Sequence, residues 1–324
     1  MLEAYCVRGG ALRAFTVPPG EAVPGDAVWL DLMAPGEGEE HAVEHACHLA
    51  VPTREEMREI EPSSRLYVED GNRFMTGSVL CQSEASRPTL AAITFILTAD
   101  RLITVRYGDP KPFRLVAAKL DRACQTGLTG DQVLMELLDA IVDRAADIIE
   151  RLSNEIDEAS DQIFSEQPGA DANRRYRALL NLIARKADIA SKVRESLVSI
   201  ARVITFLATD GEGRNLSKDQ KGALKTLQRD CTSLNDHLSY LGDKVTFLLD
   251  ATLGLVSIEQ NNIIKIFAVL SVVLMPPTLI ASVYGMNFQH MPELQWPFGY
   301  PAALLAMLVA AVVPYWFFKW KRWL

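Results

Sequence analysis

Ionised side chains are nearly absent from the C-terminal part of this 324-residue chain. Between residues 266 and 318, only Glu293 is charged at neutral pH, which argues against an entirely soluble protein. The first 260 residues, by contrast, hold 29 Lys and Arg against 40 Asp and Glu, a net charge of −11. This part lacks the positive surface that general nucleic-acid binding requires, so we expect no nucleic-acid partner. The negative charge of these 260 residues favours the binding of cations instead.

Several features of common protein classes are also missing. The five cysteines are odd in number and scattered, with no CxxC pair, which indicates reduced thiols in a cytosol. The N-terminus lacks a basic segment followed by an apolar core, so we expect no secretory signal and a cytoplasmic N-terminal domain. Neither HExxH, GxSxG nor GxxxxGK[ST] occurs, and we therefore expect neither an enzyme nor an ATP-driven pump.

Two apolar segments qualify as membrane spans. Residues 263–283 carry a single charge, Lys265, and residues 301–318 carry none, while a helix of about 20 residues crosses a bilayer. The link between them has no Lys or Arg, whereas basic residues flank the first span and follow the second. The positive-inside rule then places both termini in the cytoplasm. We expect a multi-pass protein of the cell (inner) membrane, with the lipid bilayer as a partner.

The first span carries a stripe of positions spaced three and four residues apart. The stripe comprises Asn261, Ile264, Ala268, Ser271, Met275, Thr278 and Ser282. Polar side chains inside a bilayer face protein or water, so the stripe predicts a pore-facing surface or a helix–helix seam rather than a simple anchor. Two helices cannot enclose a conduit, and a pore therefore needs several copies of the chain. Pro276 and Pro277 interrupt the backbone bonding here, which neighbouring helices or water can compensate.

The N-terminal part shows the period of strands and then of helices. Residues 1–108 contain seven strand-like runs separated by turn signals, interrupted by helical patterns at 37–49 and 53–60. We expect an α/β cytoplasmic domain with a mostly antiparallel sheet. Helices should follow over 111–124, 129–166 and 171–209.

A long stalk helix is predicted between this domain and the membrane. Residues 217–275 contain no proline, and apolar residues recur at heptad spacing from 224 to 255. One unbroken helix over 217–283 would reach about 100 Å. Off this seam, Asp236, Asp243 and Asp250 repeat every seven residues. They predict either stacked acidic rings at the inner mouth of a pore or a solvated helix face.

The residues after the first span carry a family resemblance. Tyr284-Gly285-Met286-Asn287 stands at its outer end, with MPEL behind it and a basic close, FKWKRWL. In this context the Gly-Met-Asn triplet resembles the CorA family of magnesium transporters. The upstream stretches TREEMREIEPSSR and AVWLDL are similar too, so the resemblance covers essentially the full chain. It implies a funnel-shaped homopentamer with the first span lining the pore.

The resemblance also assigns roles by position. Gly285, Met286 and Asn287 would form the external entrance for the hydrated ion, whose tightly held waters can be hydrogen-bonded by neutral amide oxygens. The implied pore-lining and gate residues are Asn261, Ile264, Phe267, Ser271, Met275, Thr278 and Ser282. Asp250 would form an acidic inner mouth, together with Asp243 on the heptad argument. Magnesium would be both cargo and regulatory ligand, bound between subunits at a site whose ligands the sequence does not place.

The expected organisation and function follow. The expected regions are 1–125 (α/β domain), 126–212 (helical hairpin), 213–283 (stalk helix and first span), 284–299 (external loop), 300–318 (second span) and 319–324 (basic tail). We expect inward, potential-driven flux of hydrated Mg²⁺, gated by cytosolic Mg²⁺, with Co²⁺ and Ni²⁺ as further divalent cargo. Two alternatives stay open: a zinc transporter of the same family, with proton coupling as one form, and a non-conducting, cation-sensing membrane scaffold.

One further pattern concerns metals. His41, His45 and His48 fall on one face of a predicted helix, at a spacing that suits zinc, nickel or cobalt. The same pattern is typical of a solvated helix surface.

Overall fold

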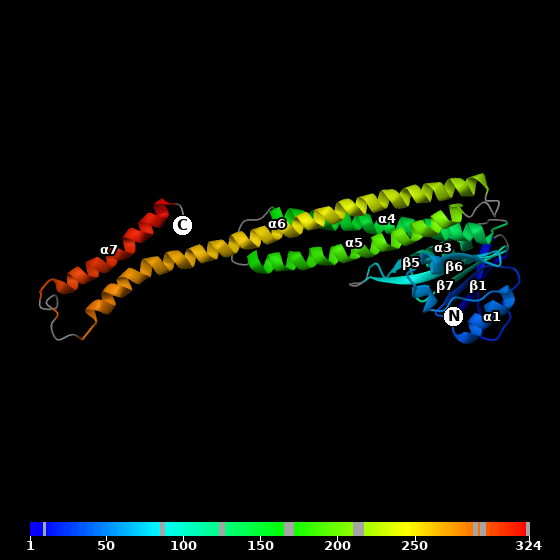
Figure 1. Cartoon of the computed structure of the whole chain (residues 1–324), viewed down its shortest axis with the longest axis horizontal. Coiled ribbons are helices and arrows are strands. Elements are labelled where there is room, and N and C mark those ends of the chain that lie inside the picture. The colour runs from blue at the N-terminus through cyan, green and yellow to red at the C-terminus, as the bar shows by residue number, and fades with distance from the viewer. Residues whose placement is uncertain are drawn as a thin grey trace. The chain divides into compact units, whose positions relative to one another are not determined.

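The computed structural model describes residues 1–8, 11–84, 88–122, 127–164, 172–209, 217–287, 291 and 296–321 (Figure 1). Cys124, Glu293, most of the MPEL stretch and the basic residue Arg322 lie outside the described residues. The chain divides into two compact units. Unit 1 comprises Met1–Gln162 and Asn181–Phe247, and unit 2 comprises Ile163–Leu180 and Leu248–Leu324.

Unit 1 is built on a seven-stranded sheet, which confirms the predicted α/β class. The strands are β1 (Leu2–Arg8), β2 (Ala11–Val17), β3 (Ala27–Met33), β4 (Leu66–Glu69), β5 (Asn72–Cys81), β6 (Thr89–Leu97) and β7 (Leu102–Arg106). Their order is β2-β1-β3-β7-β6-β5-β4. The pairing of β3 with β7 is parallel, and the other pairings that the structure describes are antiparallel. All seven predicted strands are present.

Each face of the sheet has its own apolar core. On one face, Val43 of α1 (Glu37–Cys47) and Met57 are buried with Leu30, Phe74 and other strand residues. On the opposite face, Phe113 of α3 (Lys111–Arg122) packs 6.2 Å from the ring of Trp29 and 6.3 Å from the ring of Phe95. The alternation of strand side chains produces these two layers, because successive residues point to opposite faces.

The predicted helix over 53–60 is wrong. Only a single 3-10 turn, Glu56–Arg58, and the four-residue α2 (Pro62–Arg65) form in this region. The Glu56 carboxylate accepts hydrogen bonds from the backbone N–H of Thr53 at 2.8 Å and from its hydroxyl at 3.0 Å. The chain turns extended at Glu59, where ψ is 143°, and a proline follows at 62. Proline disfavours helical geometry in the residue before it, here Glu61, so this turn and α2 do not merge into one helix.

Three long helices follow the sheet, close to the predicted bounds. They are α4 (Gly130–Phe164), α5 (Ala172–Thr209) and α6 (Lys218–Tyr284), which is 67 residues long. Within unit 1, α5 packs on the sheet, since a Cβ at Gly77 would lie 3.1 Å from the side chain of Ile200. A 3.0 Å hydrogen bond from the Arg194 guanidinium of α5 to the Ser239 hydroxyl of α6 links the two helices.

Candidate pore-lining helix and its outer end

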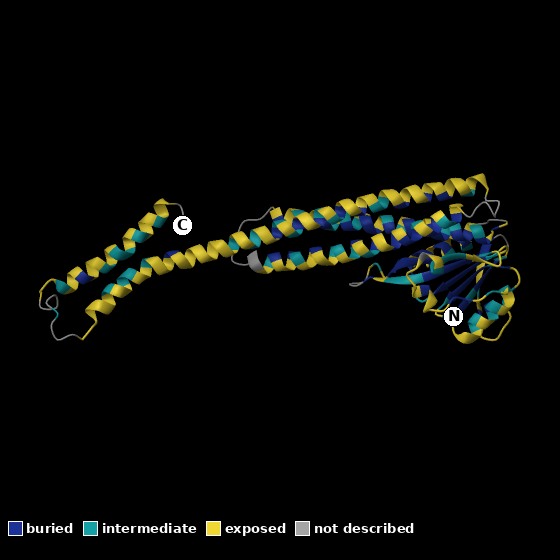
Figure 2. Cartoon of the chain, viewed as in Figure 1, coloured by how far each residue is buried: buried dark blue, intermediate teal, exposed yellow. Residues whose placement is uncertain are grey.

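Unit 2 contains both apolar helices that are long enough to cross a membrane. They are the C-terminal part of α6 and α7 (Gly299–Trp320), with mean hydropathies of 2.2 and 2.0 over their most apolar windows. Only 6% of each window is buried within the chain, and Figure 2 shows the exposed residues along both segments. Apolar side chains on this scale are unstable in water, so a bilayer or other copies of the chain must cover them.

The predicted stripe lies on one continuous helix. All seven of its positions fall within α6, and the span from Asn261 to Ser282 rises about 32 Å at 1.5 Å per residue. That rise matches a hydrocarbon core of about 30 Å. A strict 3-4 repeat drifts by about 20° per heptad on a straight helix, or about 60° over this length, so the stripe stays on one side.

The apolar members of the predicted pore set are exposed, as are most residues of this apolar segment. Ile264 is 63% exposed, Phe267 64% and Met275 69%. By contrast, Val269 is 6% exposed, between these positions in the sequence. The polar members Asn261, Ser271, Thr278 and Ser282 are exposed as well. The predicted set therefore lies on a surface that its own chain leaves uncovered.

Two of the three hydroxyl groups on the stripe, those of Ser271 and Thr278, are already satisfied as donors. Ser271 Oγ donates to the carbonyl of Phe267 at 2.9 Å, and Thr278 Oγ1 donates to the carbonyl of Leu274 at 2.7 Å. A hydroxyl oxygen retains acceptor lone pairs after its proton is used. These residues can thus present acceptors to water or to a hydrated cation without an unpaired donor.

Pro276 and Pro277 do not end the helix. α6 continues through both residues to Tyr284. Because proline has no N–H, the carbonyls of Val272 and Val273 lose their helical donors. Two adjacent backbone acceptors are thereby freed inside the apolar segment, and water or a neighbouring helix must satisfy them.

The Gly-Met-Asn triplet directly follows the C-terminal residue of α6, Tyr284. The N–H of Gly285 donates to the carbonyl of Ala281 at 2.9 Å, and the N–H of Met286 donates to the carbonyl of Val283 at 3.3 Å. A Cβ at residue 285 would lie 3.1 Å from the Ala281 oxygen, so glycine lets the last turn tighten. Met286 is 47% exposed, and Asn287, just past the turn, is exposed too.

The heptad aspartates are solvated residues of α6. Asp236 and Asp243 are exposed in unit 1, and Asp250 is exposed in unit 2. The neighbouring Lys244 is engaged elsewhere: its ammonium pairs with Asp157 of α4, and this hydrogen bond raises the pKa of Lys244. The carboxylates of the series thus remain on the helix surface.

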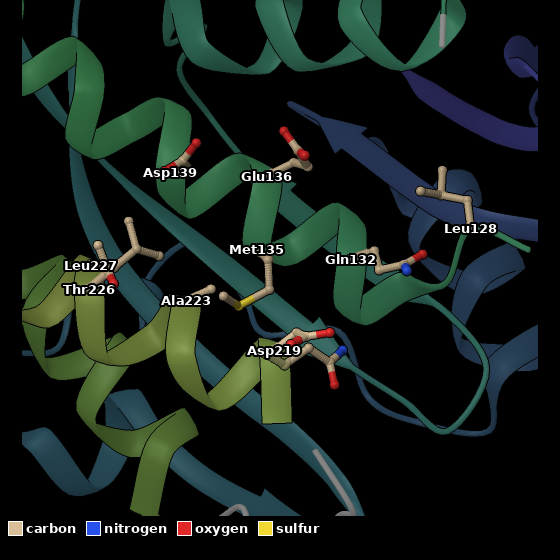
Figure 3. Close-up of a pocket in the computed structure, with 10 residues that line it drawn as sticks. Leu128, Gln132, Met135, Glu136, Asp139, Asp219, Ala223, Thr226 and Leu227 are labelled. Atoms are coloured by element: carbon tan, nitrogen blue, oxygen red, sulfur yellow. The ribbon is translucent and has the colours of Figure 1, made fainter. Parts of the chain in front are cut away.

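Unit 1 also contains an acidic cleft between the N-terminal turns of α4 and α6 (Figure 3). Glu136 and Asp139 line it from α4, and Asp219 lines it from α6, around a volume of about 480 Å³. Burial, followed by the charges of Asp143 and Glu136, raises the pKa of Asp139. The sequence does not predict that Asp139 and Asp219 line one cleft, because these residues are 80 positions apart and meet only through the packing of α4 and α6.

The histidine pattern does not become a metal site. The His45 and His48 rings lie 6.5 Å apart, while His41 pairs with Glu44 at 3.0 Å. His48 is the C-cap of α1, with a φ of 53°, and is therefore off the helical repeat. Within the part of the chain that the structure describes, no three His, Cys, Asp or Glu side chains are placed to hold a metal ion.

These features define a membrane protein with an α/β domain, a long helix and two C-terminal apolar helices. Comparison with known proteins identifies the family. The model of the CorA-like Mg²⁺ transporter protein family matches residues 24–322, and the chain belongs to this family. Its members are transporters rather than enzymes.

Individual relatives extend over nearly the whole chain. The magnesium transport protein CorA of Sodalis glossinidius (strain morsitans) is 36% identical over 301 residues, 92% of each chain. The magnesium transport protein CorA of Escherichia coli (strain K12) is 33% identical over 324 residues, all of both chains. Among solved structures, the complete CorA magnesium transporter of Methanocaldococcus jannaschii superimposes with a TM-score of 0.75 at 19% identity, covering 100% of this chain and 99% of that one.

Proposed function

We propose that this chain transports hydrated Mg²⁺ inward across the cell (inner) membrane, driven by the membrane potential. The observation that carries the proposal is the uncovered stripe of α6, which runs for about a bilayer thickness and ends at Gly285-Met286-Asn287. Family membership supports magnesium as the cargo, since the relatives are magnesium transport proteins. Both termini lie in the cytoplasm in this proposal.

The pore forms from several copies, five by family resemblance. Each contributes its stripe, so that a ring of Asn287 carboxamides stands at the external entrance beside Gly285 and Met286. Neutral amide oxygens can hydrogen-bond the waters of Mg²⁺ without removing them, whereas carboxylates would bind the ion more strongly and release it more slowly. Below this ring, the acceptor oxygens of Ser271 and Thr278 replace bulk water as hydrogen-bond partners. Co²⁺ and Ni²⁺, which also carry hydration shells, are further candidate cargo.

Energy for uptake needs no nucleotide. Moving one charge through 100 mV releases about 2.3 kcal/mol, so a divalent cation gains about 4.6 kcal/mol. Asp243 and Asp250 then act as an acidic inner mouth that keeps divalent cations near the exit.

Gating is proposed to follow cytosolic magnesium. Mg²⁺ bound between subunits stabilises a closed state in which Phe267 and Met275 constrict the pore and exclude water. Its loss shifts the population toward open states. Chelating magnesium should therefore increase protease cleavage of α6 in the purified protein, and an unchanged cleavage pattern would refute this gating scheme.

The direct test is magnesium entry into liposomes that carry the purified protein under an inside-negative potential. We expect entry that hexaamminecobalt blocks, because this complex imitates the hydrated ion and cannot exchange its ligands. Asn287→Ala should lower entry by about tenfold or more, since it removes the proposed entrance ring. Asn262→Ala is the matched control: it removes an amide one position away from the stripe and should leave entry unchanged.

Three outcomes would overturn the proposal. No magnesium entry, but zinc entry that follows a proton gradient, would make the chain a zinc transporter. No entry of any divalent cation by protein of intact oligomeric size would make it a scaffold. Equal loss from Asn262→Ala and Asn287→Ala would remove the special role of the triplet.

A further inference from the structure

A second cavity lies in unit 1, against the strand ends rather than the cleft of Figure 3. It has a volume of about 370 Å³ and is lined on one side by β5, β6 and the residues that follow β7. The segment that contains the 3-10 turn and α2 forms another side and contributes Arg54, Arg58 and Arg65. Three guanidinium groups thus converge on one cavity in a part of the chain whose net charge is strongly negative.

The structure holds two of these arginines in place without neutralising them. The guanidinium of Arg54 stacks over the Tyr107 ring, 5.1 Å from its centroid. Arg65 donates to the backbone carbonyl of Glu59 and lies 3.5 Å from Ser78 Oγ. Among the residues that the structure describes, no carboxylate forms an ion pair with Arg54, Arg58 or Arg65. Their charges are therefore available to a ligand.

Two acids line the cavity, fewer than its three arginines, and one of them is already paired. Asp109 lines it, but its carboxylate is already bound by Arg106 at 3.1 Å and by Arg114 at 3.4 Å. Glu195 of α5 is exposed at the rim. Glu56, from the arginine segment itself, is occupied in capping the backbone of Thr53.

In a neighbouring cavity, by contrast, the basic side chains are paired with an acidic side chain of the same chain. It has a volume of about 260 Å³ and is lined by Lys111 and Arg144. Both cations lie 2.9 Å from the same Glu84 carboxylate. The chain thus neutralises basic groups with internal acids on one side of Asp109 and leaves them unpaired on the other.

We propose that the Arg54–Arg58–Arg65 cavity binds a small polyvalent anion of the phosphate class. A planar guanidinium matches the oxygens of a phosphoryl group with two parallel hydrogen bonds, and its weak hydration makes the exchange of water for anion favourable. Ser78 adds a neutral polar side chain at the cavity wall, whereas the Tyr107 hydroxyl is directed to the Glu40 carboxylate at 3.5 Å and contributes only its ring. A volume of about 370 Å³ admits one or two phosphoryl groups and lies at the small end of ligand sites. This site is independent of the proposed ion pathway.

The test is calorimetric titration of the full-length protein in detergent with sodium pyrophosphate, in magnesium-free buffer of low ionic strength. We expect saturable binding that weakens as salt is added, because exposed arginines are screened. Arg54→Ala with Arg58→Ala should weaken binding by about tenfold or more, since two charge-assisted contacts are removed. Arg58→Lys keeps the charge but loses the paired donors, and it should weaken binding by less.

Arg202→Ala is the matched control, because Arg202 is an exposed arginine of α5 outside the cavity. It should bind pyrophosphate as the unmodified chain does. Absence of binding to the unmodified protein would overturn the proposal, as would equal affinity in the double variant. Magnesium flux in liposomes separates this result from the transport proposal, since either can fail while the other holds.

Discussion

Replacing Asp31 by alanine should destabilise unit 1 more than any exposed charge change. Asp31 of β3 is paired with Thr104 of β7, two residues before Arg106 on the same strand, and the Asp31 and Arg106 side chains are 2% and 6% exposed. Arg106 donates from Nη2 to Asp31 at 2.8 Å and from Nε to both carboxylate oxygens at 3.0 Å. Thr104 donates to the same carboxylate at 2.7 Å. The substitution removes the partner of a buried cation.

The expected cost is large relative to the stability of a domain. Breaking a buried pair by removing one member costs about 3–5 kcal/mol, because the remaining charge stays desolvated. Arg106 keeps contacts with Asp109 at 3.1 Å and with the carbonyl of Gly108 at 3.0 Å, which favours the lower half of that range. A domain is typically stable by about 5–15 kcal/mol, so the variant should still fold.

Thiol labelling of Cys6 provides the assay. Cys6 lies in β1, which pairs with β3, and it is 0% exposed, so alkylation requires opening of the sheet. Iodoacetamide labelling followed by mass spectrometry of the Cys6 peptide works on the full-length protein in detergent. When opening is fast relative to alkylation, a loss of about 3–4 kcal/mol raises the labelling rate by roughly 150- to 900-fold.

Two further variants test whether the cost comes from an unpaired buried charge. Asp121→Ala removes a pair with Arg13 of 2.9 Å whose side chains are 45% and 57% exposed, and it should change the rate by less than about fivefold. Asp31→Ala with Arg106→Met removes both charges and should recover much of the loss. Equal labelling in Asp31→Ala and Asp121→Ala, or no recovery in the double variant, would refute the argument.

Three other predictions follow from the described contacts. Gly130→Ala should prevent normal folding, seen as aggregation on size exclusion, because the added Cβ would lie 2.5 Å from the backbone nitrogen of Leu102; Gly222→Ala, in open space, should be tolerated. Burial raises the pKa of Cys81 to about 11, so its alkylation should remain slow at pH 7 and accelerate steeply above pH 9. Since burial and neighbouring acids raise the pKa of Asp139, its charged form is disfavoured in the folded state and folding gains stability as pH falls through this pKa. Asp139→Asn should therefore reduce the gain in melting temperature that acidification gives, measured as a series of melting curves from neutral to acidic pH.

Local patterns were sufficient to predict most of the elements. The seven strands follow from alternating apolar residues and turn signals, and α6 follows from a heptad without proline. The error at 53–60 arose because that segment has a helical pattern but inserts Met57 into the core through one short turn. Thr53 and Glu56 cap each other there, and the spacing of apolar residues carries no information about such capping.

The functional sites also differ in whether local sequence patterns are sufficient to predict them. The stripe of α6 was predictable because spacing along one helix fixes which residues share a face. The cavity with unpaired arginines was not predictable from the sequence, because Arg54 meets Tyr107 only after β7 is placed beside β6. Asp31 and Arg106 likewise lie 75 residues apart and meet across a parallel pairing.

That parallel pairing sets the order of folding. β2-β1-β3 and β7-β6-β5-β4 are each joined through antiparallel neighbours, so each half can form from nearby residues. β3 and β7 join the halves and require residues far apart in the chain to find each other, which is the slow kind of step. At about 5–20 residues per second, the ribosome takes roughly 8–30 s to go from Arg106 to the apolar part of α6. All seven strands are therefore synthesised before the first membrane helix, which leaves this interval for the two halves of the sheet to join.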